Sequence, residues 1–113
     1  MNETITILTH AYTLVKNGWT RKCFARNKHS KAVTWDSEQA CRFCAVGAIK
    51  RATHNLFPKD THETKQYKSN TAIGLLREHA LDQGYKSTVR FNDCSTKAEV
   101  LNAIKQVINA VKS

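Results

Sequence analysis

The chain has 113 residues, of which 41% are hydrophobic, with one proline and four glycines, so a disordered or low-complexity chain is excluded. This length suits one core, and we expect residues 1–113 to form a single domain. No apolar run approaches the roughly 20 residues of a membrane-spanning helix. The first residues, Met1 to Thr4, are polar and acidic, unlike a secretory leader. We therefore expect a cytoplasmic protein with no membrane contact, in which thiols stay reduced.

Basic residues outnumber acidic ones by 18 to 9, which gives a formal net charge of +9. The excess is concentrated in residues 16–31, a segment with no acidic residue. Such a segment attracts nucleic acid, an acidic protein surface or anionic lipid through the same long-range field. A solvated face that keeps a small protein soluble explains the charge equally well. Charge alone therefore does not name the partner.

The first half of the chain predicts two helices. Apolar residues at helical spacing predict the first helix over 4–17, with Gly18 at its C-terminal cap. Residues 19–26 mix aromatic, β-branched and basic side chains and predict a short strand or extended arm, and residues 27–34 predict a loop. Asp36 and Gln39 have the spacing of a capping box, so we expect the second helix to begin there and to end near Phe57.

The second half predicts two further helices. Residues 59–70 are polar and predict the longest loop, and residues 71–83 predict the third helix, ending before Gly84. Residues 85–92 include Thr88 and Val89 and predict a second short strand. Thr96 and Glu99 form a capping box for the last helix, which has the strongest apolar stripe. The fold class predicted is therefore mainly α: a compact domain of about four helices with one or two extended segments, which can pair as a two-stranded ribbon.

Cys41 and Cys44 form a Cys-x-x-Cys step inside the predicted second helix. A structural zinc site needs two pairs of ligands, and here Cys23 and Cys94 stand alone, so we expect no metal. A disulfide between Cys41 and Cys44 would only tie one helical turn to itself, and pairs with Cys23 or Cys94 stay open. A thioredoxin-like role needs the pair at a helix N-terminus after a strand, which the predicted helix does not provide. No cofactor is expected.

A second hypothesis makes Cys44 a nucleophile. A cysteine-dependent hydrolase or transferase needs a histidine base oriented by Asn or Asp, and the chain offers His79 (or His54) with Asn92 and Asp93. No local signature of such an enzyme surrounds Cys44. We expect no enzyme, and this catalytic set is the last alternative.

The favoured interpretation of these residues is structural. Ala40, Cys44, Gly47 and Ala48 form a small-residue stripe that lets another helix approach closely, and the stripe of residues 100–111 is the expected partner. Asn and Asp ahead of a helix commonly bond to local backbone, so a turn and cap explain residues 92 and 93.

Three sequence clusters together resemble a known family. They are Gly18-Trp19 followed by Phe24-Ala25-Arg26, then residues 43–49 (Phe-Cys-Ala-Val-Gly-Ala-Ile), then Phe91-Asn92-Asp93 before a helix. This order resembles a family of small bacterial and phage-associated domains of unknown function, in which the motifs usually read Trp-Cys-x-x-Gly-Ala and Trp-Asn-Asp. The present chain has Phe43 and Phe91 in place of those tryptophans. The resemblance draws attention to Cys44, Gly47, Asn92 and Asp93 and implies no activity.

The basic segment is the strongest surface candidate, because its aromatic and cationic residues alternate. We expect a small non-enzymatic protein that docks on another macromolecule, a protein with an acidic surface, and modulates it. The residues expected to bind are Trp19, Arg21, Lys22, Arg26 and Lys28. Nucleic acid bound by segment 16–31 is the first alternative. A homodimer is expected if the last helix has more apolar surface than one core can cover.

Overall fold

Five helices and three two-residue strands make up the part of the chain that the structure, a computed structural model, describes: residues 2–113. They are α1 (Asn2–Asn17), β1 (Ala25–Arg26), β2 (Ala32–Val33), β3 (Arg42–Phe43), α2 (Ala45–Leu56), α3 (His62–Asp82), α4 (Thr88–Cys94) and α5 (Lys97–Lys112). The predicted mainly α fold is confirmed. The structure has one more helix than the sequence predicts, and the ribbon has a third strand.

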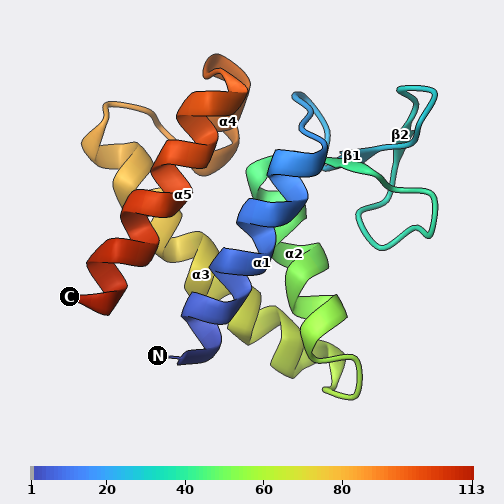
Figure 1. The fold of residues 1–113 in the computed structure, drawn as a ribbon, viewed down its shortest axis with the longest axis horizontal. Helices are drawn as coiled ribbons and strands as arrows, with labels where there is room; N and C mark the ends of the chain where they lie inside the picture. Colours follow the sequence, from blue (N-terminus) through green and yellow to red (C-terminus); the bar gives the residue numbers. More distant parts are fainter. Residues whose placement is uncertain (1) are drawn as a thin grey trace.

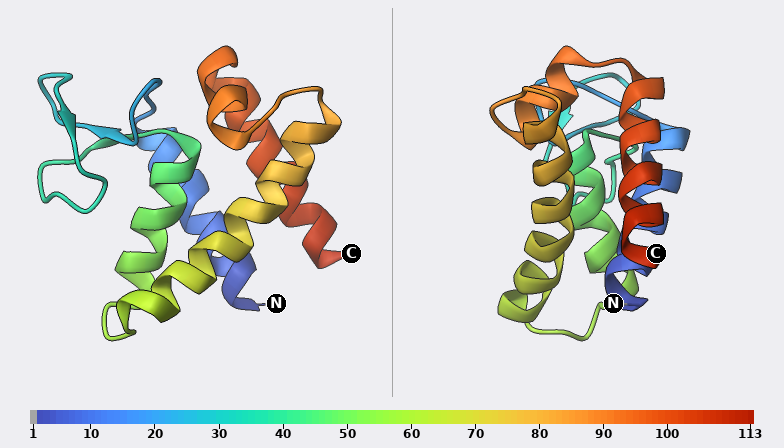
Figure 2. Two further views of the ribbon diagram at one scale, coloured as in Figure 1. Left: turned by 180° about the vertical axis from the view of Figure 1, so that it is seen from behind. Right: turned by 90° about the vertical axis from the view of Figure 1, so that its left-hand side faces the viewer.

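The helices surround one apolar core. α1 packs against α2 and α5, and α3 lies on the other side of the molecule, as the edge-on view in Figure 2 shows. The largest apolar side chains that are fully buried come from four of the helices: Ile7, Leu8, Val15, Ile49, Leu76, Val100 and Ile104. Burying a side chain of this size contributes roughly 1.5–3 kcal/mol to stability, so this core is the main stabilising feature.

A small antiparallel sheet extends from the helical body. β1 is its central strand, and Ala25 pairs with Val33 on one side and with Phe43 on the other. Figure 1 shows β1, β2 and the loops beside them projecting beyond the helices. We call residues 21–33 the arm.

The second helix begins later than predicted. Residues 34–40 form turns closed by bonds such as Ser37 N to Thr34 O (3.1 Å), and β3 follows them, so the expected start at Asp36 is wrong. Pairing of β3 with β1 outweighs the local capping signal. Cys41 and Cys44 are therefore separated by extended backbone. Three extended residues span roughly 10 Å, beyond the roughly 7 Å between Cα atoms that a disulfide tolerates.

Two other predictions are wrong. Most of the expected loop 59–70 belongs to α3, whose first turn is capped by Thr61, and Lys68 ties this part of the helix to Glu3 (3.0 Å) and Asp60 (2.6 Å). The expected strand at 85–92 is the helix α4. Its buried residues, Thr88, Phe91 and Asn92, have the 3–4-residue spacing of a helix rather than the alternation of a strand.

The two ends of the chain follow the predictions. α1 ends at Asn17, and the capping box of Thr96 and Glu99 at the start of α5 is present. The large apolar side chains exposed among residues 3–113 are Phe24, Tyr67, Leu81 and Val89, and none lies on α5. The homodimer was expected only if α5 exposed surplus apolar surface, and α5 exposes no large apolar side chain. No helix of residues 2–113 combines the length and hydrophobicity needed to cross a bilayer.

Candidate functional site

Asn92 lies at the centre of the junction between the arm and the helices, and its side chain is completely buried. Its Oδ1 accepts hydrogen bonds from Trp19 Nε1 (2.9 Å) and from the backbone N–H of Ala45 (3.0 Å). Its Nδ2 donates to the carbonyl oxygen of Thr20 (3.1 Å). An amide can both accept and donate, so this one side chain joins α4, the start of α2 and the segment that leads into the arm.

Cys44 caps the N-terminus of α2. Its Sγ accepts a hydrogen bond from the backbone N–H of Gly47 (3.3 Å), as an N-cap side chain does. Burial raises the pKa of the Cys44 thiol from 9.0 to about 11, and the backbone N–H groups of Gly47 and Val46 only partly oppose this rise. The thiol therefore stays protonated at neutral pH, whereas a nucleophilic cysteine needs a lowered pKa.

Gly47 allows the arm to cross α2 at close range. A Cβ atom at this position would lie 2.1 Å from the carbonyl oxygen of Phe24, which also accepts a hydrogen bond from Cys44 N (3.1 Å). The expected close approach at the small-residue stripe is thus present. Its partner at Gly47, however, is the backbone that leads into β1, and the expectation of packing against residues 100–111 is not met there.

Asp93 holds the turn at the base of the arm. Its Oδ1 accepts a hydrogen bond from the backbone N–H of Lys22 (2.9 Å), a residue with a φ of 69°. This left-handed backbone conformation is unfavourable for a lysine, so the carboxylate helps to fix it. We call Cys44, Gly47, Asn92 and Asp93 the clasp, because together they fasten the arm to α2 and α4.

The comparison with family models decides the affiliation of the chain, because one model matches residues 1–110. The chain belongs to DUF6197, a family of unknown function. Neither the curated proteins nor the solved structures gave a match. The resemblance to an uncharacterised domain family is therefore confirmed, and the four residues that it singled out are the clasp.

The clasp accounts for most of the hypothetical catalytic set in this DUF6197 domain. Cys44, Asn92 and Asp93 line one surface hollow, but no histidine of the described chain lines it. His79 lies against the ring of Phe91, with 6.3 Å between ring centroids, and borders cavities next to α5. His54 accepts a hydrogen bond from Lys65 (3.3 Å). The structure thus brings three of the candidates together without a base.

Residues 2–113 contain no cluster of side chains suited to bind a metal ion. No three His, Cys, Asp or Glu side chains of this part of the chain gather where they could share an ion. Cys41 and Cys94 are exposed, whereas Cys44 is buried.

Three of the five residues expected to bind a partner make contacts inside the domain. The Arg21 guanidinium stacks on Trp19, 4.9 Å from the ring centroid, and donates to the carbonyl oxygen of Ser95 (Nε, 3.1 Å). Arg26 donates to Thr20 Oγ1 (2.7 Å) and to the Ser30 carbonyl (2.9 Å). These contacts stiffen the arm. Within the described chain, the ammonium groups of the other two, Lys22 and Lys28, have no hydrogen-bond or ion-pair partner, and both residues are exposed.

The hollow at the base of the arm is mostly apolar. Its volume is about 260 Å³, and besides Cys44, Asn92 and Asp93 it is lined by Lys22, Cys23, Phe24 and Val89. Phe24 is 43% exposed and Val89 45% exposed, so the rim presents two large apolar side chains to solvent. The set of residues expected to bind contains neither of them, although Phe24 lies in the basic segment. Val89 lies within the segment 85–92 that was wrongly predicted to be a strand, and only the fold of α4 brings it beside the arm.

Proposed function

We propose that this DUF6197 domain is a non-enzymatic binding protein that docks on an acidic surface of another protein and modulates that protein. The observation that carries the proposal is the apolar hollow at the base of the arm, with Phe24 and Val89 on its rim and the unpaired lysine Lys22 in its lining. Interfaces commonly combine an apolar centre with a charged rim. We call the hollow, whose lining includes Lys22, together with Lys28 in the turn between β1 and β2, the docking face.

The charge of the docking face supports an acidic partner. The salt bridges among the described residues involve Lys68, which is on α3 and outside this face. The one carboxylate in the hollow, Asp93, is engaged by the backbone of Lys22. The lysines of the arm are therefore not neutralised within the domain, and carboxylates of a partner would steer and orient its approach.

The hollow defines the chemistry of the segment that would fill it. A volume of about 260 Å³ is too small for a helix but accommodates one or two apolar side chains. We therefore infer a partner segment with an apolar residue flanked by Asp or Glu, so that the apolar side chain contacts Phe24 and Val89 and the carboxylates reach the lysines.

A peptide selection tests the proposal. The full chain is immobilised and a displayed random peptide library is selected on it, and the affinity of the recovered peptides is measured in solution. The proposal predicts peptides with an apolar residue between acidic ones, whose binding shifts the backbone amide NMR signals of residues 22–24 and 89. Selection of basic or uncharged peptides, or of peptides that shift other signals, would contradict it.

Nucleic acid remains the second candidate, because the same exposed lysines suit phosphate groups. The structure gives it less support from stacking, since Trp19 is half-buried and its indole N–H is occupied by Asn92. An arbitrary duplex and an arbitrary single strand are titrated at several salt concentrations. Binding that weakens steeply with salt, with a slope reduced in Lys22→Ala, would favour nucleic acid over the acidic protein.

A further inference from the structure

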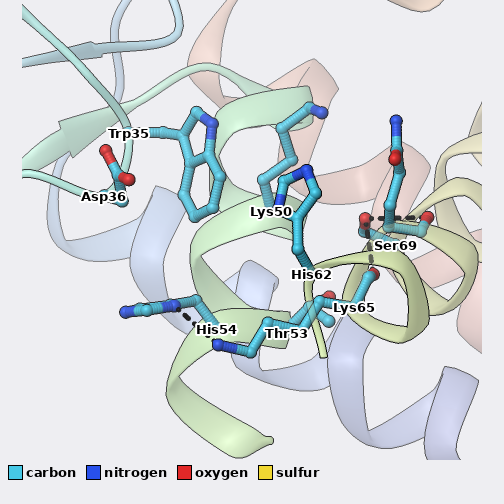
Figure 3. Close-up of a pocket in the computed structure, with 9 residues that line it drawn as sticks. Trp35, Asp36, Lys50, Thr53, His54, His62, Lys65 and Ser69 are labelled. Atoms are coloured by element: carbon cyan, nitrogen blue, oxygen red, sulfur yellow. Dashed lines mark hydrogen bonds between the residues drawn. The ribbon is translucent and has the colours of Figure 1, made fainter. Parts of the chain in front are cut away.

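A second cavity lies between α2 and α3, and it is not part of the docking face. Its volume is about 350 Å³, within the usual range for sites that hold small molecules. Trp35 and Asp36 line it from the loop after β2, Lys50 and His54 from α2, and His62 and Lys65 from α3. Figure 3 shows these side chains around a shared space.

The cavity contains more hydrogen-bond donors than the protein itself satisfies. Within the described chain, the side chains of Lys50 and His62 have no partner, and neither does the indole N–H of Trp35. The ammonium group of Lys65 donates to His54 Nδ1 (3.3 Å) and, within the described chain, forms no ion pair with a carboxylate. Two ammonium groups therefore line a cavity in which only one carboxylate is present.

The single carboxylate lies on one side. Figure 3 shows Asp36 beyond the indole of Trp35, whereas Lys50 and His62 lie on the other side of the indole, next to the edge that carries its nitrogen. Lys50 and His62 thus lie on the same side of the indole, whereas the ammonium group of Lys65 lies at His54. The side with Lys50 and His62 suits a phosphate, which accepts several charge-assisted hydrogen bonds at once.

Trp35 is held in place rather than merely exposed. Arg51 Nη1 donates a hydrogen bond to the backbone carbonyl of Trp35 (3.0 Å) and another to the backbone carbonyl of Ser37 (2.7 Å). The indole contacts the ring of His54 edge to face, with 6.0 Å between ring centroids. A fixed indole at the wall of a small cavity provides a surface for a flat ring.

We propose that this cavity binds a small molecule that carries a phosphate group and an aromatic ring, the chemical class of the mononucleotides. Lys50 and His62 contact the phosphate, and Trp35 contacts the ring. The site is separate from the docking face, so neither proposal depends on the other.

Titration of the isotope-labelled full chain with adenosine monophosphate, followed by NMR, tests this proposal. Inorganic phosphate and adenosine are titrated in parallel, because each carries only half of the proposed recognition. We expect saturable shifts at residues 35, 50 and 62 with the nucleotide and at least tenfold weaker binding of phosphate or adenosine alone. No saturation, or equal affinity for either half alone, would overturn the proposal.

Two substitutions locate the site. Lys50→Gln removes one unpaired cation, and we expect it to weaken nucleotide binding about tenfold or more. Lys105→Gln makes the same change in charge on the exposed surface of α5 and is expected to leave the affinity unchanged. An equal loss in both variants would indicate binding through net charge alone and would overturn the proposal, as would an unchanged affinity in Lys50→Gln. Amide spectra of both variants check that each is folded.

Discussion

Asn92 is the polar residue of the clasp whose loss we expect to cost the most stability. Asn92→Ala would leave the Trp19 indole N–H, the Ala45 N–H and the Thr20 carbonyl without their partner at a buried junction. Each buried polar group left unsatisfied costs roughly 1–3 kcal/mol, so we predict a loss of about 3 kcal/mol or more in the free energy of unfolding. Urea denaturation measures this loss.

The matched control is Asn102→Ala, which changes an exposed asparagine of α5 in the same way. It is expected to alter the free energy of unfolding by no more than about 0.5 kcal/mol. Similar small effects in both variants would show that the amide of Asn92 is not the junction described above.

Cys44 differs from the other cysteines in its reactivity towards alkylating reagents. Because Cys44 is buried and its raised pKa keeps the thiol protonated, we expect it to react last in the native protein at pH 7–8, after the exposed Cys41 and Cys94. Mass spectrometry of the alkylated peptides gives the order. Selective modification of Cys44 near neutral pH would instead revive the catalytic hypothesis for this residue.

The same thiol makes stability depend on pH in the alkaline range. The unfolded chain loses the Cys44 proton near pH 9.0, whereas the folded protein keeps it to about pH 11. Between these values the unfolded state binds fewer protons, so rising pH favours unfolding. Wild type should therefore lose stability relative to Cys44→Ser as the pH rises above 9. Denaturation of both proteins at several pH values tests this, and a constant difference between them would refute it.

At the scale of secondary-structure elements, two glycines in helices should respond in opposite ways to the same substitution. In Gly47→Ala the new Cβ would meet the Phe24 carbonyl of the arm, and the backbone must shift, so we predict a loss of at least about 1–3 kcal/mol. In Gly74→Ala no atom lies within 4 Å of the new Cβ on α3, and we predict a gain of about 0.5–1 kcal/mol from helix propensity. Thermal or urea denaturation compares the pair. Stabilisation by both would mean that the arm does not cross α2 closely.

Local signals predicted some elements well and others not at all. The ends of α1 and the capping box of α5 followed from residues adjacent in sequence, because Thr96 and Glu99 form their bonds within one turn. The start of α2 did not follow, because the pairing of Arg42 and Phe43 with β1 is a long-range contact that no local pattern reports. The polar surface of α3 carried no apolar stripe over residues 62–70 and therefore resembled a loop.

The candidate site shows the same division. The importance of Cys44 and Asn92 could be predicted, and so could the burial of Cys44, but their roles could not. Cys44 was expected to pack inside a helix and is instead the N-cap of α2. Asn92 was expected in a local turn and cap, and it lies instead within α4. The identity of their partners could not be predicted either, because Asn92 bonds to residues 47 and 73 positions away in sequence. The contribution of Val89 to the docking face and the cavity between α2 and α3 likewise depend on how distant elements meet.

At the scale of the whole molecule, the clasp residues fasten the arm to the helices, and the proposed function lies on the surface that they position. The clasp fixes the base of the arm, so that Phe24 and Val89 stay exposed beside Lys22, whose ammonium group has no carboxylate partner within the described chain. A rigid face of this kind binds with less loss of conformational freedom than a flexible loop. The account therefore predicts that binding and stability can be altered separately.

The most direct test of that claim is the affinity of a selected acidic peptide for two matched pairs of variants. We predict that Phe24→Ser weakens binding about tenfold or more while Tyr67→Ser, at another exposed aromatic residue, leaves it unchanged. Lys28→Glu should weaken binding strongly, and Lys105→Glu, with the same change in net charge, only slightly. Equal losses within each pair, or full affinity in Phe24→Ser and Lys28→Glu, would contradict the proposed docking face.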